Sequence, residues 1–315
     1  MATKSDLDTE VRPVDAASID AAARLIGQGL PVAVPTETVY GLAADATNAT
    51  AVARIYEAKQ RPSFNPLIIH VPTLAEAERH AEFDALARSL AERFWPGPLT
   101  LVLPRRADSP LASLATAGLP NVALRIPAHS AMQALLRAAA LPLAAPSANA
   151  SGRISPTRAG HVLASLRGRI PLILDGGPTT VGIESTIVAI SGGRARLLRA
   201  GPISPEDLAI PLDDAGPDIE APGQLLSHYA PLKSLRLDAT EAGKDEWLIG
   251  YGDVQGHASL SPRGSLVEAA ARLFDLLHEA EANSRASIAV APVPDRGLGK
   301  AINDRLRRAA APRKS

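Results

Sequence analysis

The chain has 315 residues, which is long for one average domain, so its length favours two domains. Its 33 lysines and arginines balance 33 aspartates and glutamates, so no overall field attracts nucleic acid or an anionic membrane, and any anion site must be local. The absence of cysteine excludes disulfides, thiolate metal sites and cysteine nucleophiles, and no apolar run reaches the roughly 18 residues of a membrane span, so we expect a cytoplasmic protein.

The first residues, MATKSDLDTEVRP, lack the apolar core of a signal peptide. From residue 14 to about residue 210, helical periodicity then alternates with short apolar runs. We expect Ser18 to cap a helix that runs to Ile26, and a second helix to bury Val52, Ile55 and Tyr56 and to stop before Pro62. The expected strands are PVAV, 67–71, WPGPLTLVLP, VALRIP, PLAAPS, PLILDGG, ESTIVAI and ARLLRA. The alternation predicts an α/β fold with a mixed sheet.

A second, smaller domain is predicted after a proline-rich linker. Residues 211–233 contain four prolines and two glycines, and also His228 and Tyr229, which are unusual in a plain spacer. The strand EWLIGYG, the helix SLVEAAARLFDLLHEA, the strand ASIAVAPVP and the helix GKAINDRLRRAAA follow, an order that predicts a small parallel Rossmann-like domain. We expect a solvated helix face and tail, in preference to an RNA patch, from the basic cluster Arg305, Arg307, Arg308, Arg313 and Lys314.

Two polar stretches in the first half could bind a ligand. In PTETVYG, residues 35–41, Thr36 and Thr38 could contact a small polar substrate, although an ordinary β-turn would use the same hydroxyls. Lys59 and Arg61 lie at a helix end, where the dipole favours cations. If Pro62 makes the chain extended there, both side chains could instead grip one polyphosphate. A histidine is more often a packing residue, yet His70 at the end of the next strand could join them.

Three later stretches extend this pattern. The loop PSANASGRISPT places Ser147 and Asn149 between a strand and a helix, where α/β sheets bind ligands; the alternative is a flexible loop with a capped helix. Ser185 and Thr186 precede another strand, and Arg125 and Arg199 lie in or at the ends of apolar strands. A buried arginine must pair or face a polar cavity, so Lys59, Arg61, Arg125 and Arg199 together predict an internal anion site. The sequence has no P-loop, dinucleotide or zinc motif.

An ordered set of these motifs resembles a known family. PTETVYGL, the K-x-R of AKQRPSFNPLIIHV, WPGPLTLVL, the S-x-N of PSANASG, GIESTIV and LLRAGPI occur in the order typical of the YrdC-like family. PGQLLSHYAP and the closing GLGKAINDRLRRAA are similar to the long two-domain form, the threonylcarbamoyl-AMP synthases. The resemblance implies a YrdC-like twisted mixed sheet around a basic cavity (12–210), a linker or lid (211–233) and a small Rossmann-like α/β domain (234–315).

The resemblance also implies an activity and a set of site residues. The family forms L-threonylcarbamoyladenylate and pyrophosphate from L-threonine, bicarbonate and ATP, with Mg²⁺ bound through the phosphates, and other proteins transfer the threonylcarbamoyl group to a tRNA adenosine beside the anticodon. The catalytic pairs would be Lys59 with Arg61 and Ser147 with Asn149. Around threonine would lie Thr36, His70, Arg125, Ala145 through its backbone, and Ser185. ATP would contact Lys59, Ser63, Asn121, Ser147, Ser155, Arg199 and Tyr229, and no residue is expected to bind a metal directly.

Two departures and two alternatives accompany this expectation. The linker lacks the basic residue that often precedes the histidine in the family, and Ala189 and Ile190 occupy the strand where an aspartate is often found. One alternative is an RNA-binding module of the YrdC type, which the neutral charge and the few aromatic residues disfavour. The other is a related carbamoyl-processing nucleotidyltransferase of the hydrogenase-maturation kind, whose zinc-finger regions a chain without cysteine cannot form.

Overall fold

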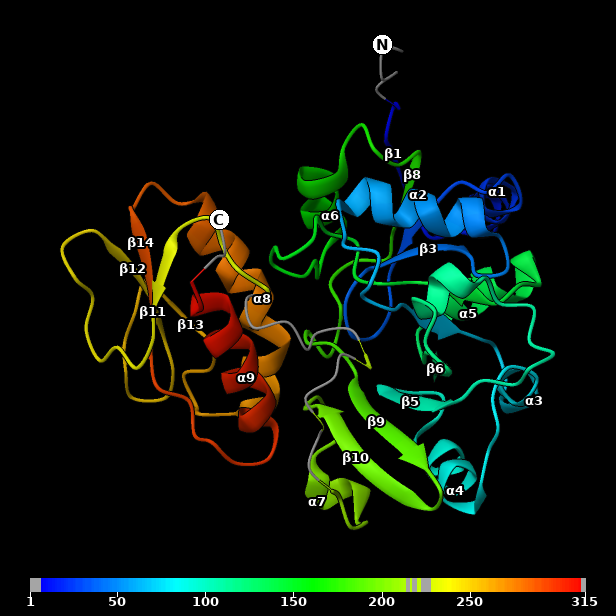
Figure 1. Ribbon diagram of the computed structural model, residues 1–315. Helices are drawn as coiled ribbons and strands as arrows, with labels where there is room; N and C mark the ends of the chain where they lie inside the picture. The colour runs from blue at the N-terminus through cyan, green and yellow to red at the C-terminus, as the bar shows by residue number, and fades with distance from the viewer. Residues whose placement is uncertain (1–6, 214–215, 217–219, 222–227, 313–315) are drawn as a thin grey trace.

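The computed structural model describes residues 7–213, 216, 220–221 and 228–312. Residues 214–215, 217–219 and 222–227 of the predicted linker, and Arg313 and Lys314 of the predicted basic face, lie outside the described residues. Two sheets organise the described part of the chain, one with ten strands and one with four (Figure 1). We call the ten-stranded sheet with its helices the N-terminal unit, and the four-stranded sheet with α8 and α9 the C-terminal unit.

The ten-stranded sheet is mixed, which confirms the α/β class predicted from the sequence. Its strands in spatial order are β1 (Glu10–Pro13), β8 (Leu172–Asp175), β2 (Val32–Val34), β3 (Gly41–Asp45), β7 (Leu143–Ala144), β4 (Ile68–His70), β6 (Asn121–Arg125), β5 (Leu99–Pro104), β9 (Thr186–Ser191) and β10 (Arg194–Arg199). The pairs β1–β8, β2–β8, β4–β6 and β5–β9 are parallel and the other neighbours antiparallel. The helical segments are α1 (Ala16–Gly27), α2 (Ala49–Lys59), α3 (Leu74–Glu78), α4 (Ala85–Phe94), the 3₁₀ turn η1 (Ser113–Thr116), α5 (Ser130–Ala139), α6 (Ala159–Leu166) and α7 (Pro205–Leu208).

One helix boundary differs from the sequence prediction, and a second agrees with it but has a different local cause. The first helix is capped by Asp15, whose carboxylate accepts from the Ser18 backbone N–H at 2.8 Å, so Ser18 lies inside the helix and is not its cap. The second helix ends at Lys59 because Gln60 adopts the left-handed conformation with φ 52°, and the Arg61 N–H then closes back onto the Tyr56 carbonyl at 2.9 Å. The break therefore precedes Pro62 by two residues.

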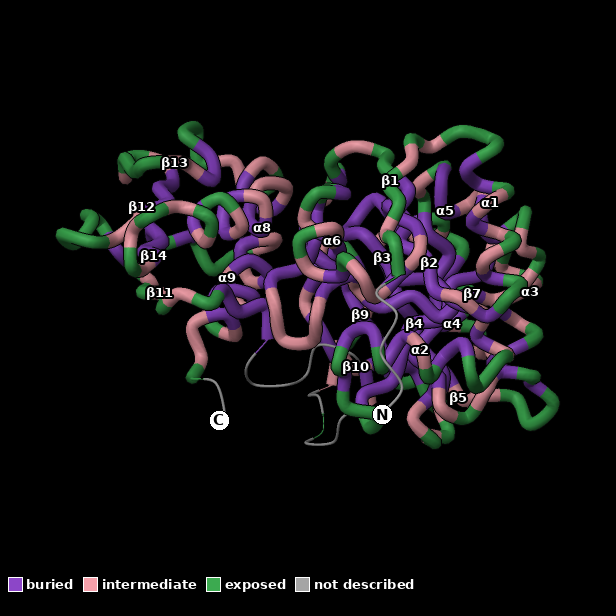
Figure 2. Tube along the Cα trace, turned by 90° about the horizontal axis from the view of Figure 1, so that it is seen from above, coloured by how far each residue is buried: buried purple, intermediate pink, exposed green. Residues whose placement is uncertain are grey.

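The C-terminal unit confirms the predicted parallel arrangement. Its strands are β11 (Ser234–Arg236), β14 (Ser287–Val290), β12 (Glu246–Gly250) and β13 (Ala258–Ser259) in spatial order, with every neighbouring pair parallel. The helices α8 (Leu266–Ala282) and α9 (Leu298–Ala310) lie between this sheet and the N-terminal unit (Figures 1 and 2). None of the helices in the described ranges has the length and apolarity that a membrane crossing requires.

One apolar cluster joins the two units. Val39, Ile154 and Ile183 of the N-terminal unit pack into the same buried cluster as Phe274 of α8 and Ile302 of α9. The C-terminal unit is therefore packed onto the loops that follow β2, β7 and β8, and not attached by the linker alone.

Candidate active site

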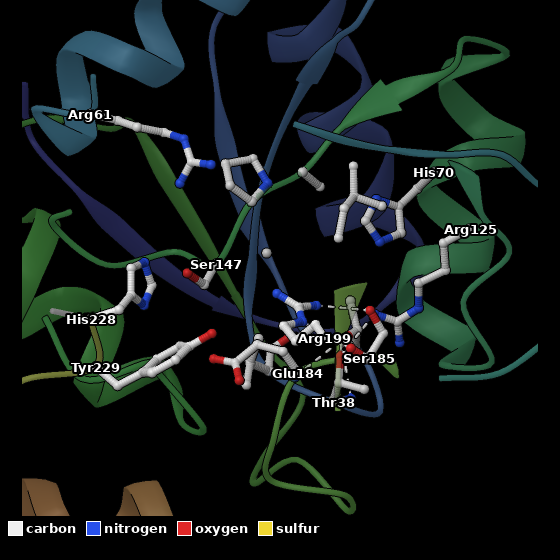
Figure 3. A pocket seen from close by; sticks show the side chains of 16 residues that line it. Thr38, Arg61, His70, Arg125, Ser147, Glu184, Ser185, Arg199, His228 and Tyr229 are labelled. Carbon is white, nitrogen blue, oxygen red and sulfur yellow. Dashed lines mark hydrogen bonds between the residues drawn. The ribbon is translucent and has the colours of Figure 1, made fainter. Parts of the chain in front are cut away.

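A cavity of about 50 Å³ lies where the loops after β2, β7 and β8 meet His228 and Tyr229 of the linker (Figure 3). The side chains of Arg61, His70, Arg125, Arg199 and Tyr229 point toward one central space. The cavity is lined by Thr36, Thr38, Val39, Gly41, Arg61, Ile68, His70, Arg125, Ala145, Pro146, Ser147, Glu184, Ser185, Arg199, His228 and Tyr229. Segments from residue 36 to residue 229 therefore converge on one small polar space.

Arg125 closes one side of the cavity. It ends β6, where its side chain would be a costly buried charge unless paired. Its guanidinium donates to a Glu37 carboxylate oxygen at 2.7 Å, to the Thr38 hydroxyl at 3.0 Å and to the Gly97 carbonyl at 3.1 Å. Burial raises the pKa of Glu37, but the charge of Arg125 and its hydrogen bond outweigh burial and lower that pKa overall. This pair keeps the turn after β2 in contact with β6.

Thr36 is held within the same turn. Its hydroxyl donates to the Val39 carbonyl at 2.7 Å and lies 2.8 Å from the Thr38 hydroxyl. The hydroxyls of Thr36 and Thr38 thus hydrogen-bond within their own turn, as one of the two expectations had it. Both residues also line the cavity, where their contact with a substrate stays a prediction.

Arg199 and Ser185 form a second polar group in the cavity wall. The guanidinium of Arg199 donates to the Ser185 carbonyl and to its hydroxyl, each at 3.0 Å. The Ser185 hydroxyl also lies 2.7 Å from the Thr100 hydroxyl of β5. Three strands, β5, β9 and β10, thus fix the position of one hydroxyl at the cavity.

Lys59 and Arg61 take different directions although one residue separates them. The fully buried Lys59 ammonium donates to the Ser147 and Asn149 carbonyls, at 2.5 Å each, and so holds the S-x-N loop. Arg61 donates to the Asn65 and Pro66 carbonyls, at 3.2 and 3.0 Å, and lines the cavity. The K-x-R and S-x-N pairs lie next to each other, as expected. Within the K-x-R pair, Arg61 lines the cavity, whereas Lys59 lies behind the lining.

His70 is a neutral side chain in the cavity wall. Burial, with the nearby Arg125 charge, lowers the pKa of His70 to about 3, so the imidazole is uncharged at neutral pH. Its Nδ1 atom is buried and has no partner among the described residues. A neutral histidine with an unused ring nitrogen is suited to hydrogen-bond a ligand.

The linker contributes His228 and Tyr229. Tyr229 is almost fully buried in the left-handed conformation with φ 62°, and Ala230 anchors this stretch by donating to the Gly152 carbonyl at 2.8 Å. The Tyr229 hydroxyl and the His228 Nδ1 atom are buried without a hydrogen-bond partner among the described residues. His228 and Tyr229 therefore line the cavity and bring two polar groups to it that have no partner among the described residues.

Positive charge is concentrated at the cavity. Burial lowers the pKa of Arg61 to about 10, and burial together with the Arg61 charge holds the pKa of Lys59 well below its usual range. Burial also lowers the pKa values of Arg199 and His228, and neighbouring arginines reinforce the effect. Buried positive charges that repel one another in this way favour an anion in the space between them.

Five predicted site residues do not line the cavity: Lys59, Ser63, Asn121, Asn149 and Ser155. Ser63 is exposed, and Asn121 begins the strand whose other end carries Arg125. The Asn149 amide shapes its own loop by donating to the Ala150 and Arg153 carbonyls, both at 2.9 Å. Ser155 is fully buried behind Glu184, to which its hydroxyl donates.

Sequence reasoning missed two charged residues next to the cavity. Glu184 lines it, and Arg305 of α9 pairs with Glu184 at 2.9 Å while being fully buried. The assignment of Arg305 to a solvated face is therefore wrong. The only available signal was an acidic residue within GIEST, directly before a buried strand, which requires a buried partner.

These observations define a class of protein: a two-unit α/β protein whose mixed sheet and linker enclose an arginine-rich site for small anionic substrates. Comparisons with known proteins narrow the class. Residues 24–201 match the Sua5/YciO/YrdC family, described as telomere recombination, and residues 195–311 match the threonylcarbamoyl-AMP synthase C-terminal domain. The chain belongs to the threonylcarbamoyl-AMP synthase family in its long, two-part form.

Individual relatives match over almost the whole chain. The threonylcarbamoyl-AMP synthase of Bacillus subtilis is 40% identical over 93% of this chain and 92% of its own length. The threonylcarbamoyl-AMP synthase of Pyrococcus abyssi is 38% identical over 92% of this chain and 93% of its own length. The crystal structure of P. abyssi Sua5 complexed with L-threonine aligns with a TM-score of 0.88 and 36% identity, covering 96% of this chain and 97% of that one.

Proposed function

We propose that this protein is a nucleotidyltransferase that forms L-threonylcarbamoyladenylate and pyrophosphate from L-threonine, bicarbonate and ATP. The observation that carries the proposal is the cluster of buried cations around one cavity, with Arg61, Arg125 and Arg199 in its wall. Three anionic groups, the ATP phosphates, bicarbonate and the threonine carboxylate, must meet in this reaction, and fixed cations offset their repulsion.

We assign the threonine side of the site to the wall formed by Arg125, Thr36, His70 and Ser185, with the Ala145 backbone. This wall offers one guanidinium for the carboxylate, together with hydroxyls and a neutral imidazole for the amine and the carbamate. The crystal structure of the P. abyssi relative with L-threonine supports a threonine site in this fold.

We assign the ATP side to the remaining part of the cavity wall, where Arg61 and Tyr229 lie and where Arg199 adjoins Ser185 of the threonine side. Ser147 adds a hydroxyl, and Lys59, Asn149, Ser63, Asn121 and Ser155 are placed on this side from the motif resemblance. The K-x-R and S-x-N pairs carry the catalytic role in this proposal. Lys59 acts there by fixing the carbonyls of Ser147 and Asn149, and Arg61 by neutralising phosphate charge.

The chemistry balances with these groups. The threonine nitrogen attacks the bicarbonate carbon, losing a proton as water leaves, and the product is a carbamate. A carbamate oxygen then attacks the α-phosphorus, and the bond to the bridging oxygen breaks with its electron pair leaving on pyrophosphate. Carbamates hydrolyse readily, so enclosure of the cavity protects the intermediate. Positioning and charge neutralisation supply most of the catalysis in such transfers.

Substrate entry requires the linker to move. The cavity of about 50 Å³ is much smaller than the roughly 300–1,000 Å³ of a small-molecule site. His228 and Tyr229 cover it, so we propose that the linker, residues 211–233, opens to admit ATP and closes over the carbamate. The units on either side of it are proposed to span residues 12–210 and 234–315.

The remaining assignments concern the surroundings of the reaction. The described residues hold no group of three or more histidines and acidic residues that could bind a metal, so we propose that Mg²⁺ arrives on the ATP phosphates as part of the substrate. We place the enzyme in the cytoplasm, with threonylcarbamoyl-transfer proteins as its partners and tRNA reached only through them. The RNA-module alternative is not supported, since these cations are buried beyond the reach of a nucleic-acid backbone.

A pyrophosphate-release assay tests the proposal. Release should require ATP, L-threonine and bicarbonate together, and omission of any one should abolish it. Lys59→Met, which removes the amine but keeps the chain length, should lower the rate by about a hundredfold. Lys300→Met is the matched control, because Lys300 makes only a surface ion pair with Glu206 and should keep wild-type activity. Pyrophosphate release that does not depend on threonine would refute the proposed function.

A further inference from the structure

Arg305 is a buried cation that the C-terminal unit places beside the cavity. Its Nε atom donates to a Glu184 carboxylate oxygen at 2.9 Å, and its Nη1 atom donates to the Ala200 carbonyl at 2.8 Å and to Asp304 at 2.9 Å. The guanidinium carbon lies 5.3 Å from the centroid of the Tyr229 ring. One side chain of α9 thus contacts Ala200, which follows β10, Glu184 in the loop before β9, and Tyr229 of the linker.

Glu184 connects Arg305 to the cavity. One of its carboxylate oxygens accepts from Arg305 and the other from the Ser155 hydroxyl, while the side chain lines the cavity close to Arg199 (Figure 3). Without Arg305, this buried carboxylate would lose its ion-pair partner, and the charge of Arg199 would be left to offset it in the wall of an anion site. Arg305 therefore sets both the charge and the orientation of Glu184.

The loop that carries Glu184 is also fixed by α8. Gly182 has φ +78°, and a Cβ atom there would lie 2.4 Å from the Ala270 carbonyl oxygen and 2.5 Å from the Ala271 Cα atom. Ile183 is fully buried in the cluster shared by the two units. Helix α8 thus packs closely against the loop at Gly182, and α9 contacts the same loop at Glu184 through Arg305. The C-terminal unit therefore constrains the conformation of this loop by two separate contacts.

From these contacts we infer that Arg305 is a positioning residue of the active site, through which the C-terminal unit holds Glu184 and Ser155 in the arrangement that binds ATP. This inference rests on the proposed function in identifying the anion as ATP. It assigns the C-terminal unit a direct part in nucleotide binding. Arg305 acts through Glu184 and is not itself expected to touch the substrate.

Calorimetric titration with ATP alone, without threonine or bicarbonate, tests the inference by binding and not by turnover. Arg305→Met removes the ion-pair partner of Glu184, and the ATP dissociation constant should rise about tenfold to a hundredfold because that carboxylate then repels the phosphates and competes with them for Arg199. Adding Glu184→Gln removes the charge, and the double variant should recover most of the lost affinity. A purely structural role of Arg305 predicts the reverse, since the second change would then add a further loss.

Two further variants make the test decisive. Arg307→Met removes an exposed charge from the same helix and should leave ATP binding within about twofold of wild type. Arg305→Lys keeps the charge but loses the forked geometry, so a loss of about fivefold, between wild type and Arg305→Met, is expected. It also serves as the test if Arg305→Met does not fold.

Wild-type ATP affinity in Arg305→Met, or in Arg305→Lys if only that variant folds, overturns the inference. So does a double variant that binds ATP more weakly than Arg305→Met. Failure of the proposed function would look different, because the wild type would then bind ATP with the same dependence on residue 305 but form no threonylcarbamoyl product.

Discussion

Arg61 illustrates how single residues are prepared for an anion. Its side chain is anchored to the Asn65 and Pro66 carbonyls, so the guanidinium is held in one orientation at the cavity wall. Burial lowers its pKa to about 10, yet it remains charged at neutral pH. A fixed, charged fork at this place suits a phosphate group better than a mobile ammonium does.

Arg61→Lys should therefore be a damaging change despite keeping the charge. We expect kcat/KM for ATP to fall about tenfold to a hundredfold, since hydrogen bonds from charged groups contribute about 1.5–3 kcal/mol. The matched control is Arg105→Lys, because Arg105 also donates to two backbone carbonyls, of Ser109 and Leu111, but does not line the cavity. Equal losses in the two variants would show that the effect is one of local structure.

The sequence predicted single residues well where local chemistry alone decides their role. An arginine in the apolar strand VALRIP had to pair or face a polar cavity, and Arg125 does both. Arg305 failed as a prediction because its partner, Glu184, is 121 residues away in sequence, and helical periodicity alone cannot tell a solvated face from one packed against another unit.

At the contact between helices α6 and α8, partly buried histidines should make the free energy of unfolding depend on pH. The rings of His161 on α6 and His278 on α8 stack with centroids 3.8 Å apart, beside the ion pair of Arg158 with Asp275 at 2.6 Å. Burial, reinforced by His278, lowers the pKa of His161 to about 3. The folded protein therefore keeps this histidine neutral where the unfolded chain, with a pKa near 6.5, binds a proton.

The sign of the effect follows from the proton count. Below about pH 6.5 the unfolded state binds more protons than the folded state, so the free energy of unfolding falls as the pH decreases toward about 3. Between pH 7.5 and pH 5.5, His161 should account for a loss of about 1.4 kcal/mol.

Urea unfolding at the two pH values measures this loss. His161→Asn removes the titrating group, so the change in its unfolding free energy between the two conditions should be smaller than that of the wild type by about 1.4 kcal/mol. Parallel losses in the wild type and the variant would mean that the titration of other groups, such as His70, accounts for the whole effect.

At the scale of elements, apolar runs and breakers predicted most strands of both units, together with the helices α1, α2, α8 and α9. The strands β1, β3, β11 and β13 were not anticipated, because EVRP, GLAAD, SLR and AS carry few of the β-branched and aromatic residues that mark a strand. They exist because neighbouring strands supply their hydrogen bonds, as β2 and β7 do for β3. Such pairing is a tertiary effect that local sequence does not encode.

At the scale of the whole molecule, the two units and the linker form one site. Arg305 and Gly182 tie the C-terminal unit to the loop behind the cavity, while Tyr229 packs against Phe274 of α8, with ring centroids 5.6 Å apart, and covers the cavity from the linker. The enclosure matters because the central claim is that a carbamate, unstable in water, is made and adenylylated inside this protein.

Incubation with ¹³C-bicarbonate, L-threonine and ATP, followed by mass spectrometry of the nucleotide products, tests that claim most directly. We predict L-threonylcarbamoyladenylate that carries one ¹³C atom in its carbamoyl group, formed together with an equal amount of pyrophosphate. Consumption of ATP without a labelled threonine adduct, or an adduct whose carbamoyl carbon does not come from bicarbonate, would contradict the account.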